Sequence, residues 1–297
     1  MQIQKPLLAA TFDPDKAKFP YLATEKIDGI RFLMVNGQAV SRSFKPIRNK
    51  YIQRLLSESL PDGIDGELTC GSNFQDSSSG IMSIEGEPEF QVWIFDYVDP
   101  ELDTILDYTE RLEQLHEMEA TGTFAMGLEG KYVVLYPSEV NSIEEVEEAM
   151  ENITAMGFEG LMLRDPRGTY KFGRASVKSN ILLKVKKFQD DEAVVVGFTE
   201  KMSNQNEPTR DAFGYIDRAT AKDGLVPADT LGAFILDYKG ETLRCGSGLN
   251  DELRKEIWDN QEEYVGKMVK FKYMSHGVKD LPRHPIFLGF RDADDMS

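Results

Sequence analysis

A six-residue stretch near the start of the chain, Lys26-Ile27-Asp28-Gly29-Ile30-Arg31, constrains the fold more than any other part of the sequence. Strand-like segments flank it on both sides, so its lysine and its arginine lie where strands end. A lysine amine can attack phosphorus, and a nearby arginine can hold the phosphate that is attacked. The alternative interpretation is a surface turn with Asp28-Gly29 at its tip, because this pair favours tight hairpin turns.

The residues that follow predict a β-hairpin. Two strand-like runs flank Asn36-Gly37, a pair that two-residue hairpin turns favour. The second run leads into Ser41-Arg42-Ser43, which brings Arg42 to within one short hairpin of Lys26. We therefore expect Arg42 near the reactive lysine. The alternative is a solvated charge at the end of a strand.

Two carboxylates follow a short helix that we expect near residues 49–59. Asp65 and Glu67 alternate along a strand, so they point to the same face of it. Like charges on one face repel each other unless a cation or a hydroxyl lies between them. We therefore expect Mg²⁺ or a ribose at this face, although the Asp65-Gly66 pair is also consistent with one more hairpin turn.

Aromatic and β-branched residues dominate the segment 90–99, which predicts a strand. Either Phe95 or Tyr97 can stack on a nucleobase from one face of this strand, and core packing is the alternative for both. Helices are expected over residues 107–120 and 142–156, which serve as scaffold. The second of these opens with Ser142 and Glu145, the pattern of a capping box.

A second group of charged residues follows this helix. Glu159 opens a strand within "GFEGLMLRDP", and Lys184 and Lys186 alternate onto one side of the strand in "ILLKVKKF". Two lysines on one face of a strand would be unpaired in a core, so they either reach solvent or face an anion. A phosphate is the simplest anion that fits.

The charge of the chain is strongly segregated. A net charge of −17 argues on its face against a nucleic-acid partner. However, residues 26–50 hold six basic side chains and one acid, residues 164–187 eight and one, and residues 267–283 five and one. Residues 99–119 hold eight acids and one base, and residues 139–151 six acids and no base. This pattern predicts one phosphate-facing surface and an acidic back.

The general composition is that of a globular chain long enough for two domains. Of its 297 residues 41% are hydrophobic and 29% are charged. No apolar run approaches the ~18 residues of a membrane span, and the first residues lack the pattern of a secretory signal, so we expect a cytoplasmic protein without a membrane partner. Two distant cysteines predict neither a disulfide framework nor a zinc site.

A second domain is expected from about residue 189. Short strands with one helix among them, "NDELRKEIWDN", are typical of a small barrel of the oligonucleotide-binding type. The polar stretch 201–230 lies between the first two barrel strands and is too long for a tight turn. It either supplies an extra DNA contact or is a disordered or solvated flap.

Six short motifs together resemble one enzyme superfamily. "KIDGIR", "SRS", "DGEL", "VWIFDYV", "FEGLMLR" and "LLKVKKF" occur in the order and approximate spacing of the covalent nucleotidyltransferases, which include ATP-dependent DNA ligases, RNA ligases and mRNA capping enzymes. The resemblance spans essentially the whole chain and is greatest to the small ATP-dependent DNA ligases of bacteriophages. The segment "LPRHPIFLGFRDAD" resembles their last motif, except that Ala293 stands where a lysine is usual.

This resemblance implies an α+β fold. Residues 1–188 would form an adenylation (nucleotidyltransferase) domain with antiparallel sheets and flanking helices, and residues 189–297 a C-terminal OB-fold β-barrel. It also implies that the enzyme grips its substrate with these two domains only.

The implied function is the sealing of 5′-phosphate/3′-hydroxyl nicks in duplex DNA with ATP, in DNA replication, repair or recombination. AMP would first become attached to Lys26, then to the 5′-phosphate of the nick, and would leave when the 3′-hydroxyl attacks. The expected cofactors are ATP, with AMP as the covalent intermediate, and Mg²⁺, or alternatively Mn²⁺. The expected partner is nicked duplex DNA, bound by a monomer.

The resemblance also assigns roles to individual residues. Catalytic roles fall to Lys26, Asp28, Arg31, Lys184 and Lys186. Nucleotide binding involves Thr24, Glu25, Lys26, Arg31, Glu67, Phe95, Lys184, Lys186, Arg283 and Arg291. The nicked DNA would contact Arg42, Lys45, Arg174 and Lys178, and the metal ion would be held by Asp65, Glu67 and Glu159.

Two other functions remain open at this point. An RNA ligase or an mRNA capping guanylyltransferase would share the lysine, the acidic residues and the barrel, and a capping enzyme would take GTP in place of ATP. A non-catalytic DNA-binding module is the second alternative. It would not need Lys26, Asp65, Glu67 and Glu159 together, and its overall charge would be basic.

Overall fold

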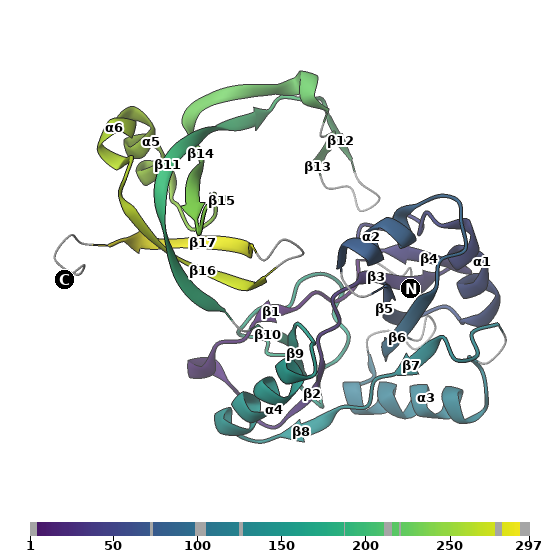
Figure 1. Ribbon diagram of the computed structural model, residues 1–297. Helices are drawn as coiled ribbons and strands as arrows, with labels where there is room; N and C mark the ends of the chain where they lie inside the picture. Colours follow the sequence, from purple (N-terminus) through teal and green to yellow (C-terminus); the bar gives the residue numbers. More distant parts are fainter. Residues whose placement is uncertain are drawn as a thin grey trace. The chain divides into compact units, whose positions relative to one another are not determined.

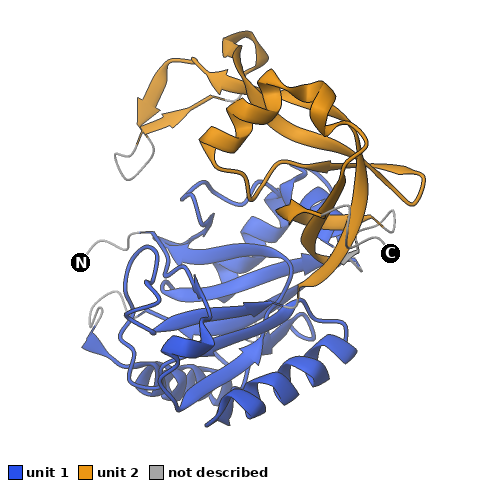
Figure 2. Cartoon of the chain, turned by 90° about the vertical axis from the view of Figure 1, so that its left-hand side faces the viewer, with its two compact units in different colours: residues 1–186 blue, residues 187–297 orange. Residues whose placement is uncertain are grey.

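A computed structural model gives the fold of the chain. It describes residues 5–71, 74–98, 105–124, 127–186, 188–210, 216–219, 221–276 and 281–291, without the side chains of 275 and 276. The chain divides into two compact units, residues 1–186 and 187–297 (Figure 2). The boundary lies two residues before the position expected from the sequence.

The first sheet of unit 1 combines both ends of that unit. Its strands are β1 (Ala10–Thr11), β10 (Leu182–Lys186), β9 (Gly160–Arg164), β2 (Tyr21–Glu25) and β8 (Ser138–Val140), in that spatial order. β1 pairs with β10 in parallel, and the other neighbours are antiparallel. Helix α4 (Ile143–Ala155) lies against one face of this sheet (Figure 1). Its Val146 and Met150 share a buried cluster with Leu161, Leu163 and Leu183 of that face. The opposite face is therefore left for polar residues.

The second sheet of unit 1 carries the hairpin that the sequence predicts. Its strands are β4 (Gln38–Ser41), β3 (Ile30–Val35), β5 (Ile64–Cys70), β6 (Phe90–Tyr97) and β7 (Tyr132–Val134), in that order. β3 and β4 are joined by Asn36 and Gly37, which have φ angles of 51° and 70°. Positive φ at both positions is what this two-residue turn requires, so the predicted turn is confirmed.

Three helices flank the second sheet, and side-chain caps fix where two of them begin. α1 (Lys50–Ser59) is capped by Asn49, and α3 (Tyr108–Ala120) by a capping box of Asp107 and Glu110. The third helix, α2 (Phe74–Met82), was not expected. At α4 the Ser142 cap is present, but the Glu145 carboxylate accepts from the backbone of Asn141 instead of closing the predicted box.

Unit 2 is a curved five-stranded sheet. Its strands run in the order β15 (Glu241–Cys245), β14 (Leu225–Tyr238), β11 (Gln189–Asn204), β16 (Met268–His276) and β17 (Pro282–Phe290), all antiparallel. A bridge between Ser247 and Ile286 connects the β15 end to β17, as the closure of a barrel requires. The helices α5 (Asp251–Asp259) and α6 (Gln261–Tyr264) follow β15, and Ile257 and Tyr264 join the core.

The polar stretch 201–230 is mostly strand where the structure describes it. β11 continues to Asn204 and β14 begins at Leu225, and the two pair over this length (Figure 1). Between them lie the short paired strands β12 (Pro208–Arg210) and β13 (Ile216–Arg218). The interpretation as a disordered segment is therefore wrong for these residues, whereas β12 and β13 are exposed to solvent.

The architecture agrees with the expected α+β class: unit 1 holds two five-stranded sheets with flanking helices, and unit 2 holds one curved five-stranded sheet with two short helices. Within the described residues, no helix is both long enough and apolar enough to cross a membrane.

Candidate active site

Lys26 lies directly after β2, where neighbouring strands of the first sheet bring charged residues together. Its backbone N–H donates to the carbonyl of Gly160 at 2.7 Å, which continues the ladder between β2 and β9. Glu159 immediately precedes β9, and Lys186 is the register partner of Gly160 on β10. A Cβ on Gly160 would lie 2.2 Å from the carbonyl oxygen of Val185, so this close approach of the strands requires glycine.

Glu159 links the two lysines. Its Oε2 accepts from Lys26 Nζ, and its Oε1 accepts from Lys186 Nζ at 2.5 Å. The carboxylate is 6% exposed and the lysines about 20%. Burial opposes the charge of Glu159, but Lys26 and Lys186 outweigh it and lower the pKa of this carboxyl. Glu159 is therefore an ionised partner shared by both lysines.

Lys184 and Lys186 share one face of β10, as the alternation predicts. Lys184 lies beside Met162 of β9, which in turn lies beside Thr24 of β2, so a row of side chains crosses the sheet. Burial lowers the pKa of Lys184, and the positive charges of Lys186 and Arg174 act in the same direction. The row ends at Lys184, whose positive charge is disfavoured unless an anion lies nearby.

A cavity of about 280 Å³ lies between the two sheets of unit 1. Both sheets and the N-terminal segment contribute side chains to its walls. They are Leu8, Ala9, Thr24, Glu25, Lys26, Ile27, Arg31, Arg42, Glu67, Phe95, Met162, Arg164, Arg174, Lys184 and Lys186. Cations are in clear excess, so the cavity suits a ligand with several negative charges and an apolar part.

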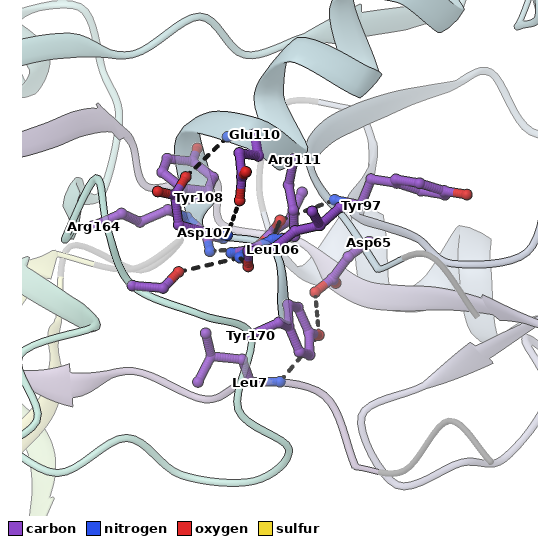
Figure 3. A network of polar contacts seen from close by, with 12 residues as sticks. Leu7, Asp65, Tyr97, Leu106, Asp107, Tyr108, Glu110, Arg111, Arg164 and Tyr170 are labelled. Atoms are coloured by element: carbon purple, nitrogen blue, oxygen red, sulfur yellow. Dashed lines mark hydrogen bonds and ion pairs between the residues drawn. The ribbon is translucent and has the colours of Figure 1, made fainter. Parts of the chain in front are cut away.

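Arg31 forms a two-pronged ion pair with Asp65 at one wall of the cavity. Arg31 Nε donates to Oδ1 and Nη2 to Oδ2, each at 2.6 Å. Asp65 also accepts from the hydroxyl of Tyr170 at 2.7 Å (Figure 3) and is 0% exposed. Both carboxylate oxygens thus accept from protein donors, and Asp65 fixes the orientation of the Arg31 guanidinium.

Asp96 lies opposite Asp65 on the next strand and forms a second buried network. It accepts from Arg111 Nε of α3 at 2.7 Å and from Arg164 Nη1 of β9 at 2.5 Å. Burial alone would raise the pKa of Asp96, but Arg111 and Arg164 reverse the effect and lower it. The network thus connects β6 of the second sheet with β9 of the first, and removal of one partner would leave a buried charge uncompensated.

Phe95 occupies the same wall as these arginines. The guanidinium carbon of Arg31 lies 4.9 Å from the centre of the ring, and that of Arg164 lies 5.5 Å from it. The ring lines the cavity, whereas Tyr97 is buried in the core of the second sheet. Phe95 is therefore the aromatic residue of this strand that can stack on a bound base.

Glu67 is the cross-strand partner of Arg31 and lines the cavity. Burial raises the pKa of Glu67 to about 7, although Arg31 and Lys26 act in the opposite direction. A Cβ on Gly29 would lie 2.2 Å from the carbonyl oxygen of Leu68, so glycine at this position lets residues 26–31 pass close to β5. The carboxyl of Glu67 can accept from a ligand hydroxyl or a metal ion.

The structure does not gather the three predicted metal ligands. In the part of the chain that it describes, no group of three His, Cys, Asp or Glu side chains could hold a metal ion. Both oxygens of Asp65 are engaged by Arg31 and Tyr170, and both oxygens of Glu159 by Lys26 and Lys186. The assignment of Asp65, Glu67 and Glu159 to a metal ion stays a prediction, and Mg²⁺ is usually held by one or two carboxylates together with phosphate oxygens.

Other predicted residues are distributed as follows. Thr24, Glu25, Arg42 and Arg174 line the cavity, and the last two are exposed. Asp28, Lys45 and Lys178 are outside the cavity lining, and the two lysines are exposed. Arg283 lies on β17 of unit 2, and Arg291, just beyond it, donates to Glu192 at 2.5 Å. The positions of Asp292 and Ala293 lie outside the described residues.

Four residues at the site were not predicted. Asp96, Arg111 and Arg164 form the network between the sheets, and Tyr170 supports Asp65. A charged residue inside the aromatic strand 90–97 must be paired, and this signal could have identified Asp96. Tyr170 offered no local signal, because its partner Asp65 is 105 residues away in the chain.

Two family models match the chain. The model described as ATP dependent DNA ligase domain matches residues 6–186. The model described as DNA ligase OB-like domain matches residues 226–291. A comparison with curated protein sequences gives no match.

Several solved structures are similar over nearly the full length. The Chlorella virus DNA ligase-adenylate is 40% identical, with 98% of this chain and 99% of that chain covered and a TM-score of 0.59. A Lig E DNA ligase is 22% identical, with 97% and 100% covered and a TM-score of 0.74. The ATP-dependent DNA ligase of bacteriophage T7 in complex with ATP is 18% identical, with 97% and 98% covered and a TM-score of 0.51. The last two show similarity of fold alone.

Proposed function

The chain belongs to the ATP-dependent DNA ligases, whose family function is nick sealing, and from this membership we propose which of its residues perform each step. Lys26 is the nucleophile. The observation that carries this assignment is its position: Lys26 lines a cavity together with further cationic side chains, and its Nζ contacts the carboxylate of Glu159.

In the first step, the amine of Lys26 attacks the α-phosphorus of ATP. A nitrogen–phosphorus bond forms, the bond to the bridging oxygen of the β-phosphate breaks, and pyrophosphate leaves with the electron pair of that bond. Lys26 must give up a proton before its amine can attack. The product is AMP attached to Lys26.

The second and third steps pass AMP to the DNA and release it. An oxygen of the 5′-phosphate at the nick attacks the phosphorus of the lysyl-AMP, and the amine of Lys26 leaves. The 3′-hydroxyl then attacks the activated 5′-phosphate, and AMP leaves. Because each step is a displacement at phosphorus, most of the catalysis is positioning and neutralisation of charge.

The cationic walls provide this neutralisation. Lys184 and Lys186 face the cavity together and hold the α-phosphate. Partial burial disfavours the charge of Lys184, and a bound anion offsets this cost. Arg42 and Arg174 are exposed at the cavity and contact the phosphates of the nick, and the exposed Lys45 and Lys178 extend the DNA contact.

The other walls select the nucleoside. Phe95 stacks on the adenine, Glu67 and Arg31 bind the ribose and adjacent groups, and Thr24 and Glu25 line the cavity beside them. Asp28, which lies within the same stretch as Lys26, orients that stretch.

Mg²⁺, or alternatively Mn²⁺, is the metal cofactor, and Glu159 and Glu67 are the residues that would hold it together with phosphate oxygens. When bound, it supplies positive charge to the phosphates of ATP. Glu159 also holds Lys26 and Lys186 in place through its two ion pairs.

The enzyme acts on nicked duplex DNA as a monomer, in the cytoplasm and without a membrane partner. One chain supplies the nucleotide cavity and the OB-like unit. Sedimentation equilibrium of the protein with and without a nicked duplex tests the stoichiometry, and a dimeric complex would contradict it.

Two assays on the same variants test the assignment. One measures transfer of label from ATP to protein, and the other measures sealing of a nick that already carries AMP. Lys26→Ala should abolish the first and retain the second, because the third step does not use the amine. Arg283→Ala and Arg291→Ala should reduce the first far more than the second, because we assign both arginines to the pyrophosphate end of ATP.

The outcomes separate the alternatives. Labelled protein from Lys26→Ala would reject this lysine as the nucleophile. If Arg283→Ala lost the same fraction of activity in both assays, the arginine would be assigned to DNA binding instead. Label transfer from GTP in preference to ATP would identify a capping enzyme, and a preference for RNA at the nick would identify an RNA ligase.

A further inference from the structure

Tyr170 lies between β9 and β10, outside every motif that carries the family resemblance. Its hydroxyl donates to Asp65 Oδ2 at 2.7 Å and accepts from the backbone N–H of Leu7 at 3.1 Å (Figure 3). The hydroxyl thus both donates and accepts, toward a carboxylate of the active site on one side and toward the N-terminal segment on the other.

These contacts are part of a closed ring of hydrogen bonds. Asp65 accepts two bonds from Arg31, and Arg31 Nη2 also donates to the carbonyl of Leu7 at 3.2 Å. The ring therefore runs from Leu7 to Tyr170, to Asp65, to Arg31 and back to Leu7. Three of its four members are almost fully buried, with Leu7 and Tyr170 1% exposed and Asp65 0% exposed. Water therefore has little access to replace a bond that is removed.

The geometry of an arginine–carboxylate pair makes this ring a positioning device. Two parallel bonds force the plane of the guanidinium to follow the plane of the carboxylate. Whatever fixes the Asp65 carboxylate therefore also fixes Arg31, which lines the cavity. The hydroxyl of Tyr170 restrains this carboxylate from the side of the segment between β9 and β10.

We propose that Tyr170 is a positioning residue for nucleotide transfer, and that its hydroxyl orients Arg31 toward the nucleotide through Asp65. The proposal rests on the function assigned above to Arg31. It also gives Asp65 a role that does not involve a metal ion.

The ring of Tyr170 has separate packing contacts that a phenylalanine would keep. Its centre lies 5.6 Å from that of Phe172, and the guanidinium carbon of Arg111 lies 5.5 Å from it. Burial and the charge of Asp65 raise the pKa of Tyr170 well above its ordinary value, so the hydroxyl remains a donor over the working pH range. Tyr170→Phe therefore removes the hydroxyl and little else.

The chain offers a matched control in Tyr21. This residue is 0% exposed, belongs to the same unit, and its hydroxyl accepts from the backbone N–H of Lys18 at 2.8 Å. Tyr21 does not line the cavity as the described residues form it. Tyr21→Phe therefore removes a backbone hydrogen bond of the same kind without touching Asp65 or Arg31.

The experiment is a double-mutant cycle read out as single-turnover transfer of AMP from labelled ATP to the protein. Tyr170→Phe should reduce the rate constant at saturating ATP about tenfold, as the removal of a hydrogen bond to a charged group predicts, and Tyr21→Phe should leave it unchanged. In an Arg31→Lys background, which cannot form the two-pronged pair, Tyr170→Phe should change the rate less than about twofold.

Thermal unfolding of each variant sets the assay temperature, so that every rate is measured on folded protein. Equal reductions in rate from Tyr170→Phe and Tyr21→Phe would overturn the proposal, and so would a Tyr170→Phe effect that persists in full in the Arg31→Lys background. Failure of the proposed function has a different signature, because Arg31→Lys alone would then leave the transfer of AMP unchanged.

Discussion

At the scale of single residues, the charged side chains of the site share one property, which is that each is partly shielded from water. Lys26, Arg31, Glu67, Lys184 and Glu159 are each partly or largely buried. Each lies near other charges, and burial together with these neighbours shifts the pKa of Glu67, Glu159 and Lys184. Stability and activity should therefore respond to pH through particular side chains.

Glu67 gives a prediction for stability. Its pKa is about 7 in the folded chain and about 4.5 when unfolded, so between these values the folded state binds more protons and becomes less stable as pH rises. Glu67→Gln removes this dependence. Without nucleotide, the variant should gain in free energy of unfolding relative to the parent from pH 4.5 to about 7, by up to about 3 kcal/mol, and the difference should then level off.

Urea unfolding at a series of pH values measures this difference. Glu147→Gln, on the exposed side of α4, is the matched control because it removes one carboxylate outside the cavity lining. A difference between Glu67→Gln and the parent that stays constant from about pH 4 to about pH 8 would show that burial does not control the charge of Glu67.

At the scale of the elements, the sequence predicted what is encoded locally. The turn at Asn36-Gly37 and the cap Ser142 were predicted, and each depends on a few adjacent residues. The caps Asn49 and Asp107 are equally local, but only the helices that they begin were expected. The paired strands within 201–230 were not expected, because their polar composition is typical of loops and their partners are each other. Pairing between neighbouring strands overrides the local preference of their residues there.

The same distinction applies to the site. The alternation of Lys184 and Lys186 is a property of one strand and was predicted correctly. Asp65 and Glu67 also alternate, but the sequence could not indicate that Arg31 would occupy both oxygens of Asp65. Pairing across strands decides which carboxylate remains available for a ligand.

Gly29 provides a prediction for the packing of β3 against β5. A methyl group there would meet the carbonyl oxygen of Leu68 at 2.2 Å, and backbone atoms cannot move aside easily. Gly29→Ala should lower the free energy of unfolding by about 1–3 kcal/mol and should reduce the transfer of AMP to protein, because Lys26 lies on the displaced segment. Gly289→Ala is the control, because its Cβ would meet no atom within 4 Å and should change stability little. Equal destabilisation by the two variants would contradict this account.

At the scale of the whole molecule, a chain of net charge −17 has to bind a polyanion. The basic segments 26–50 and 164–187 supply the cationic side chains of the cavity and the exposed cations around it, so the DNA contact that we propose is local, while the overall field repels the DNA. Beyond about 10 Å that field is screened at about 0.1 M salt. The rate of sealing with limiting enzyme should therefore be greatest at intermediate ionic strength.

A salt titration of nick affinity at constant Mg²⁺ tests this. Lys178→Glu, on a basic segment, should weaken binding and reduce the log–log salt slope by about 0.9 for each phosphate that the protein no longer neutralises. Glu147→Lys makes the opposite change of charge on the acidic helix α4 and should alter affinity much less. If both changes shifted affinity by the same factor, net charge alone would govern binding.

The parallel pairing of β1 with β10 also affects the order in which the chain can fold during its synthesis. The first strand of the sheet cannot pair with the last one until late, because a ribosome releases residues 10–11 long before residues 182–186. Lys26 and Glu159 meet through the pairing of β2 with β9, and the late strand β10 adds Lys186 to them. A nascent chain that still lacks β10 therefore lacks Lys184 and Lys186, two cations of the cavity, and the lining of the cavity is complete only after the entire first unit has been synthesised.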